Sequence, residues 1–87
     1  MRTIAKPIQM VNWMDEEGLI TPVRFRIMNE DGAATVVPIM RIHRTDKQRI
    51  AGNINYTFHC EININERIML CEIRYNLENC RWILFKL

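Results

Sequence analysis

Apolar and polar residues alternate along most of this chain, and the pattern is clearest in its last third. Residues 56–62 and 69–75 each place apolar side chains at every second position, with mainly polar residues between them. A period of two is typical of a β-strand that buries one face, because successive side chains of a strand point to opposite sides. The closing run, Arg81–Leu87, carries apolar residues on both sides. These segments predict three strands in the last third of the chain.

Three more strands are expected earlier, at Ile8–Met14, Ile20–Met28 and Ala34–His43. Glycine-containing turns separate them, and an Asp31-Gly32 pair between two alternating runs favours a hairpin. Pro38 lies within the third run, which indicates an edge strand or a bulge, because proline donates no hydrogen bond to a β-ladder. For the same reason, residues 1–7 are expected to form an N-terminal arm that ends at Pro7.

The segment from Arg44 to Asn53 is the longest polar stretch of the chain and shows no apolar periodicity. It is therefore interpreted as a loop. The alternative is a short helix over residues 44–52, which would make the fold α+β and cover one end of the sheet. Ile50 would be its only apolar anchor, and a helix that is polar all round is rarely stable.

These elements predict an all-β fold in a single domain, residues 1–87. Short connections between consecutive strands indicate an antiparallel meander of about six strands. An open sheet would leave one apolar face uncovered, and no helix is available to cover it. The sheet is therefore expected to curl into a small barrel or roll.

Composition and cysteine content indicate the cellular compartment in which the protein is expected. The chain has 87 residues, is 48% hydrophobic and carries a net charge of +2. It contains no apolar run near the roughly 20 residues that a membrane-spanning helix needs, and the basic N-terminus lacks the apolar segment of a signal peptide. Three cysteines without tight spacing do not suggest a secreted disulfide framework. We therefore expect a cytoplasmic protein that does not interact with membranes.

The usual signals of enzymatic chemistry are missing from the sequence. The chain has no serine, and its three glycines are isolated in turns, so neither a serine nucleophile nor a phosphate-binding glycine loop can be drawn. The carboxylates of residues 15–17 are adjacent, but they fall in a hairpin turn, where solvent-exposed acidic side chains are common. We predict no catalytic residue and no cofactor, and therefore a protein that is not an enzyme.

A zinc site built from three cysteines and a histidine is an alternative interpretation of these residues. Its candidate ligands are Cys60, Cys71, Cys80, His59 and His43. The chain has no Cys-x-x-Cys knuckle, and neighbours such as His59 and Cys60 face opposite sides of a strand. Cys60 and Cys71 also alternate in register with apolar residues, so buried thiols are the simpler interpretation.

Basic residues suggest one binding function. Those that we predict to contact nucleic acid or another anion are Arg24, Arg26, Arg41, Arg44, Lys47 and Arg49. Small barrels bind single-stranded nucleic acid when such cations hold the phosphates and exposed aromatic rings stack on the bases. The net charge of +2 is low for that function. Single-stranded nucleic-acid binding is therefore kept as the alternative function.

Apolar side chains on both faces of the first and last strands point to a different partner. A short chain can bury only one face of its sheet, so the second apolar face predicts an interface. The residues expected at that interface are Trp13, Trp82 and Leu84. The first functional prediction is therefore a non-enzymatic interaction domain that binds another protein or forms a homo-oligomer.

The order of landmarks also resembles a family of small, uncharacterised Firmicutes proteins. The landmarks are Gly18, the run Pro22–Arg26, the strand Val37–Ile42, the Ala51-Gly52 loop before Tyr56-Thr57, Cys60, and Arg81-Trp82. The resemblance would cover about residues 10–85. The chain departs from it at Asn53, where a second glycine is expected, and in its longer segment after Trp82. It implies a single β-domain and transfers no catalytic residue.

Overall fold

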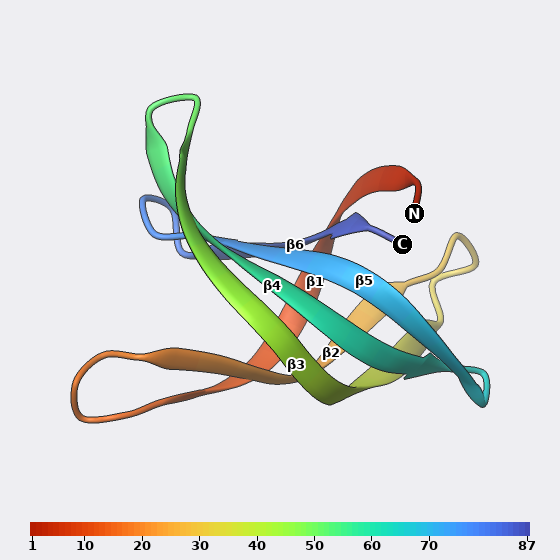
Figure 1. Cartoon of the computed structure of the whole chain (residues 1–87). Coiled ribbons are helices and arrows are strands. Elements are labelled where there is room, and N and C mark those ends of the chain that lie inside the picture. Colours follow the sequence, from red (N-terminus) through yellow and green to blue (C-terminus); the bar gives the residue numbers. More distant parts are fainter.

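A computed structural model describes all 87 residues of the chain. Its elements are six strands: β1 (Thr3–Met14), β2 (Ile20–Met28), β3 (Ala34–Ile50), β4 (Asn53–Ile64), β5 (Arg67–Asn76) and β6 (Arg81–Lys86). Each strand pairs antiparallel with the next, and β1 pairs with β6, so that the sheet closes into a barrel (Figure 1). This confirms the predicted all-β meander of six antiparallel strands in a small barrel.

Two strands bend so that each half pairs with a different neighbour. β1 pairs with β6 over Thr3–Ile8 and with β2 over Gln9–Met14. β3 pairs with β2 over Ala34–Pro38 and with β4 over Ile39–Ile50. The barrel therefore consists of a three-stranded sheet (β1, β2, β3) and a five-stranded sheet (β1, β6, β5, β4, β3), which share β1 and β3 at their corners.

Nine buried apolar residues fill the inside of the barrel. They are Phe25, Val37, Phe58, Cys60, Ile62, Cys71, Ile73, Trp82 and Leu84. Most of them occupy every second position of β4, β5 and β6, as the period of two predicted. The expected burial of Cys60 and Cys71 is confirmed, and the two thiols face each other across the β4–β5 pair.

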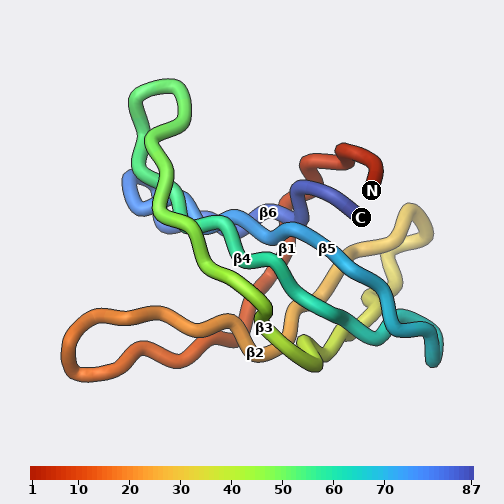
Figure 2. Tube along the Cα trace, in the orientation of Figure 1, coloured from red at the N-terminus to blue at the C-terminus, as the bar shows by residue number.

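The expected N-terminal arm is wrong, because residues 3–7 belong to β1. Lys6 and Pro7 pair with Leu84 and Ile83 of β6, and Arg2 and Leu87 exchange two backbone hydrogen bonds of 2.8 and 3.0 Å. The two ends of the chain therefore lie together (Figure 2). Pro7 is tolerated because this half of β1 pairs on one side only, so the missing N–H can belong to the open side.

The loop expected over residues 44–53 is also wrong. β3 continues to Ile50, and the two-residue turn Ala51-Gly52 connects it to β4. Both turn residues have positive φ, 50° and 86°, as a type I′ hairpin turn requires. This hairpin extends past the barrel wall, so both of its faces are partly wet and it needs no apolar face. A strand of this kind gives no alternation of apolar and polar residues to detect.

Pro38 marks the corner of β3, as its interpretation as an edge or bulge residue predicted. It pairs with Arg24 of β2, and pairing with β4 starts at the next residue. An irregular register between Ile39 and Arg41 follows directly. Proline at this point costs no ladder hydrogen bond because the strand is leaving one sheet for the other.

Two hairpins project from the barrel and are named here as arms. The β1–β2 arm comprises residues 12–22, and the β3–β4 arm comprises residues 46–56, of which Asn55 and Tyr56 at its base still pair with β5. In the view of Figure 1 both extend to the left of the barrel, the first in orange below and the second in green above. They form because β1 continues with β2 after its pairing with β6 has ended, and β3 continues with β4 after its pairing with β2 has ended.

We predict that Glu66→Gly stabilises the protein by about 1 kcal/mol, because a left-handed conformation costs a residue with a side chain roughly that much. Asn65 and Glu66 form the two-residue turn between β4 and β5, with φ values of 51° and 65°. The type I′ turn favours Asn-Gly at these positions. The midpoint of urea unfolding measures the effect. Glu78→Gly, in a turn position without positive φ, is the matched control and should not stabilise. Equal midpoints for the two variants would contradict the prediction.

Candidate binding surface

The outer side of the three-stranded sheet forms the main candidate surface, named here the β1–β2–β3 face. It carries Gln9, Val11, Trp13, Arg24, Arg26, Val36 and Pro38. Strand register places them together, because Gln9 lies opposite Arg26 and Val11 lies opposite Arg24, while Met10, Phe25 and Val37 turn inward. None of the side chains on this face is acidic.

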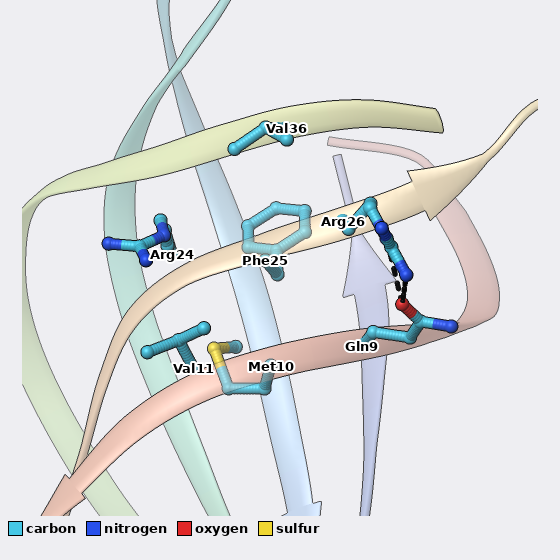
Figure 3. Close-up of a pocket in the computed structure, with 7 residues that line it drawn as sticks. All are labelled: Gln9, Met10, Val11, Arg24, Phe25, Arg26 and Val36. Atoms are coloured by element: carbon cyan, nitrogen blue, oxygen red, sulfur yellow. Dashed lines mark hydrogen bonds between the residues drawn. The ribbon is translucent and has the colours of Figure 1, made fainter. Parts of the chain in front are cut away.

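A shallow hollow of about 360 Å³ lies on this face (Figure 3). Its walls come from all three strands, and the residues drawn in Figure 3 include both arginines with Val11 and Val36 on either side. The structure therefore brings two of the predicted contact residues, Arg24 and Arg26, to one hollow. The signal in the sequence was the clean alternation of β2, which put both arginines on the side away from Phe25.

The two arginines differ in their hydrogen-bond partners within the chain. Arg26 donates from Nε and Nη2 to Oε1 of Gln9, at 2.8 Å from Nε, and this holds its guanidinium flat along the sheet (Figure 3). Arg24 has no hydrogen-bond or ion-pair partner within the chain and is exposed. An unpaired arginine keeps its donors available for an acceptor from outside.

Exposed apolar side chains accompany the arginines. Trp13 is 73% exposed and Val36 is 60% exposed, and both Val11 and Val36 line the hollow. Met14 and Leu19, nearer the tip of the β1–β2 arm, are also exposed. The prediction that Trp13 is available for an interface agrees with its position. The sequence contains no signal for Val36, Met14 or Leu19, because single apolar residues are common on protein surfaces.

Trp82 and Leu84, the other predicted interface residues, are buried in the core, and that prediction is wrong. Leu84 is fully buried opposite Ile73, and the ring of Trp82 lies 4.8 Å from Tyr75 and 5.6 Å from Phe58, measured between centroids. Both faces of β6 are apolar, so the sequence could not tell which one points inward. Register with β5 decides it.

The predicted basic segment is divided between surfaces. Arg44 lies on the outer side of the five-stranded sheet, where its Nε is 3.1 Å from Oδ2 of Asp46. Lys47 and Arg49 lie opposite Tyr56 and Ile54 and so occupy the other side of the β3–β4 arm. Arg41 is exposed without a partner. These cations therefore do not form one patch, and Arg44 is already neutralised.

A network of charged groups occupies the outer side of β3, β4 and β5. Nε2 of His59 is 3.0 Å from Oδ2 of Asp46 and 3.1 Å from Nη2 of Arg44, and its Nδ1 is 3.6 Å from Oε1 of Glu72. The hydrogen bond with His59, with help from Arg44, holds the pKa of Asp46 below its usual value. His43 and Glu61 form a neighbouring pair at 2.8 Å. Opposite charges placed across strands in this way stabilise the sheet and compensate each other.

The cysteines and histidines do not converge on one point. Cys60 and Cys71 are inside the barrel, His59 is on the outer side of the same strand, and Cys80 lies in the exposed β5–β6 turn. No group of three or more potential ligands is arranged to hold a metal ion. The neighbouring thiol of Cys60, together with burial, raises the pKa of Cys71, so this thiol stays protonated.

No family model, no curated protein and no solved structure matches this chain. The resemblance to small Firmicutes proteins therefore stays a prediction. The structure also contains no helix that is long and apolar enough to cross a membrane.

We predict that Asp46→Asn lowers stability at neutral pH and flattens the acid side of the stability profile. A carboxylate whose pKa is lowered by folding stabilises the fold above its unfolded pKa of about 4, and this contribution is lost as pH falls through the lowered value. Unfolding free energies measured from about pH 7 to about pH 2 test this. Glu30→Gln, which removes a carboxylate without any partner, should reproduce the wild-type profile. An Asp46→Asn profile parallel to wild type would contradict the assignment.

Proposed function

We propose that this chain is a non-enzymatic interaction domain that associates with a second copy of itself. The observation that carries the proposal is the set of exposed apolar side chains on the β1–β2–β3 face and its adjoining arm, namely Val11, Trp13 and Val36 with Met14 and Leu19. Large exposed apolar side chains that gather on one side of a small protein are a mark of interaction sites. Trp is also enriched among the residues that dominate binding energy at interfaces.

The charges of the two arms support a second copy as the partner. At the tip of the β1–β2 arm, Oδ1 of Asp15 accepts hydrogen bonds of 2.9 Å from the backbone N–H groups of Glu17 and Leu19. Asp15 thereby forms the turn, and the carboxylates of Glu16 and Glu17 remain without partners. This arm is therefore acidic and apolar at once.

The β3–β4 arm carries the opposite charge. Lys47 has no partner, and Arg49 donates only to the carbonyl oxygen of Gly52, at 3.3 Å. In a twofold-symmetric pair, the acidic arm of each copy can meet the basic arm of the other, so both contacts form together. Such complementary charges fix the register of an interface more than they add affinity, and the apolar residues supply the affinity.

Sedimentation tests the association itself. The wild-type chain should be dimeric at about 100 μM, and Trp13→Ala should weaken the dimer about 30-fold, as expected for loss of a central aromatic residue worth about 2 kcal/mol. Leu70→Ala is the control, because Leu70 is exposed to a similar degree but lies on β5, outside the proposed surface. A strictly monomeric wild type would refute the proposal.

An exchange of charges tests the pairing of the arms. Glu16→Lys with Glu17→Lys makes both arms basic, and Lys47→Glu with Arg49→Glu makes both arms acidic, so each variant alone should be largely monomeric. A one-to-one mixture should restore the dimer, because both arm contacts then join opposite charges. If each variant dimerises like wild type, or if the mixture stays monomeric, the arms do not pair in this way. Dissociation by Trp13→Ala would still support self-association.

Single-stranded nucleic-acid binding is the second candidate function. It is favoured by one observation: Arg24, Arg26 and Trp13 share a face without acidic residues. Phosphates can contact the arginines while a base stacks on the exposed indole. The remaining predicted contacts do not strengthen it, because Arg44, Lys47 and Arg49 lie elsewhere.

Binding of a labelled oligonucleotide at low and high salt measures this candidate. Each phosphate contact that is made contributes a slope of about −0.7 to log K against log salt for single strands. Two contacts from Arg24 and Arg26 give a slope near −1.4, and Arg24→Gln should halve it. Arg41→Gln is the control. If it weakens binding as much as Arg24→Gln does at every salt concentration, the site is not on this face. No binding at about 50 mM salt removes the candidate.

A further inference from the structure

A second, larger hollow lies on the outer side of the five-stranded sheet. It is located where β1 pairs with β6, beside the β5–β6 turn. Its volume is about 500 Å³, and its polar walls are Asn55, Arg74, Asn76, Asn79 and Arg81, with Trp82 beneath. Register explains the grouping, since Asn55 lies opposite Asn76 and Asn76 lies opposite Arg81. This hollow is separate from the β1–β2–β3 face and from both arm tips.

The turn between β5 and β6 orients two of the amide side chains. Oδ1 of Asn76 accepts a hydrogen bond of 2.8 Å from the N–H of Glu78, and Oδ1 of Asn79 accepts one of 3.0 Å from the N–H of Arg81. The N–H of Leu77 donates to the carbonyl of Ile54 at 3.0 Å and ties the turn to β4. Each amide oxygen thus accepts a hydrogen bond within the turn, while the NH₂ groups donate to no group of the chain and stay available to a ligand in the hollow.

Two arginines add donors and positive charge. Arg81 is exposed and has no acceptor within the chain. The guanidinium carbon of Arg74 lies 3.3 Å from the centroid of the Phe85 ring, which holds it in place, and its Nε is buried without any hydrogen-bond partner. Because Nε has no access to the surface, Arg74 can contact a ligand only through its terminal Nη groups. No acidic residue lines this hollow, in contrast to the compensated network around His59.

Asn55 supplies the single free acceptor. Its side chain is only 7% exposed, and its NH₂ group donates to the carbonyl of Asn53 at 3.3 Å. Its Oδ1 makes no hydrogen bond within the chain. A polar side chain that is this deeply buried normally has its groups paired, so an acceptor left open toward the hollow matches a ligand that carries an O–H or N–H donor.

We propose that this hollow binds a small molecule with a phosphate or carboxylate group and an adjacent hydroxyl or amine. Arg81, Arg74 and the NH₂ groups of Asn76 and Asn79 hold the anion, and Oδ1 of Asn55 accepts from the neighbouring donor. Arginine suits this task because its planar fork matches both anions. A volume of about 500 Å³ falls within the range of small-ligand sites. The proposal does not depend on self-association.

The fluorescence of Trp82 reports on occupancy. The chain has two tryptophans, so Trp13→Phe leaves Trp82 as the only one, directly at the hollow. In this background, inorganic phosphate and acetate are titrated separately at constant ionic strength. A saturable change with phosphate supports the phosphate class of ligand, and one with acetate supports the carboxylate class. No saturable change with either anion up to about 10 mM overturns the proposal.

Two variants locate the binding. Arg81→Gln should weaken the titrated anion at least about 10-fold, since a charge-assisted hydrogen bond is worth roughly that factor or more. Asn79→Asp keeps the oxygen that accepts from Arg81 N–H but replaces the donor with a negative charge, so it should abolish binding without disturbing the turn. Arg67→Gln, an exposed arginine at the other end of β5, is the control and should bind like the parent. Equal affinity in all three variants would place the anion elsewhere and refute the site.

Discussion

Closure of a short sheet is the constraint on which the rest of this structure depends. Six strands must form a ring in a chain of 87 residues, and the ring has to enclose a core of nine buried apolar residues. Strands cannot curve that sharply without changing partners, so β1 and β3 each pair with one neighbour in their first half and another in their second. Pro38 lies at one of these changes, where a missing N–H is harmless.

The two corner strands also determine where binding can occur. At one end each corner strand keeps a single neighbour, β2 for β1 and β4 for β3, and these pairs continue into the two arms. The inside of the barrel is filled by side chains, so the candidate surfaces all lie outside. One is the outer side of the three-stranded sheet with its adjoining arm, and the other is the hollow beside the β5–β6 turn.

Uncompensated charge distinguishes these surfaces from the rest of the molecule. Around His59, each charged group has an opposite partner within the chain, and Arg44 is committed to Asp46. Arg24 and Arg81 have no such partner, and no carboxylate shares their surfaces. A count of basic residues along the sequence cannot make this distinction, because it depends on which side chains meet across strands. A net charge of only +2 therefore does not reveal that two local surfaces carry uncompensated positive charge.

The sequence by itself determined the fold class, most strand positions and the burial of Cys60 and Cys71, because a period of two is a local property of each strand. It failed at residues 3–7 and 44–53, where pairing partners far along the chain supply the order that the local pattern lacks. It also misplaced Trp82 and Leu84, since a strand with two apolar faces gives no sign of which face is buried. Only the tertiary structure decided which face is buried. It also decided that the basic residues of β3 lie on different surfaces, and that Arg74 and Arg81 line one hollow with three asparagines. These depend on register between strands, and register is set by closure of the barrel as a whole.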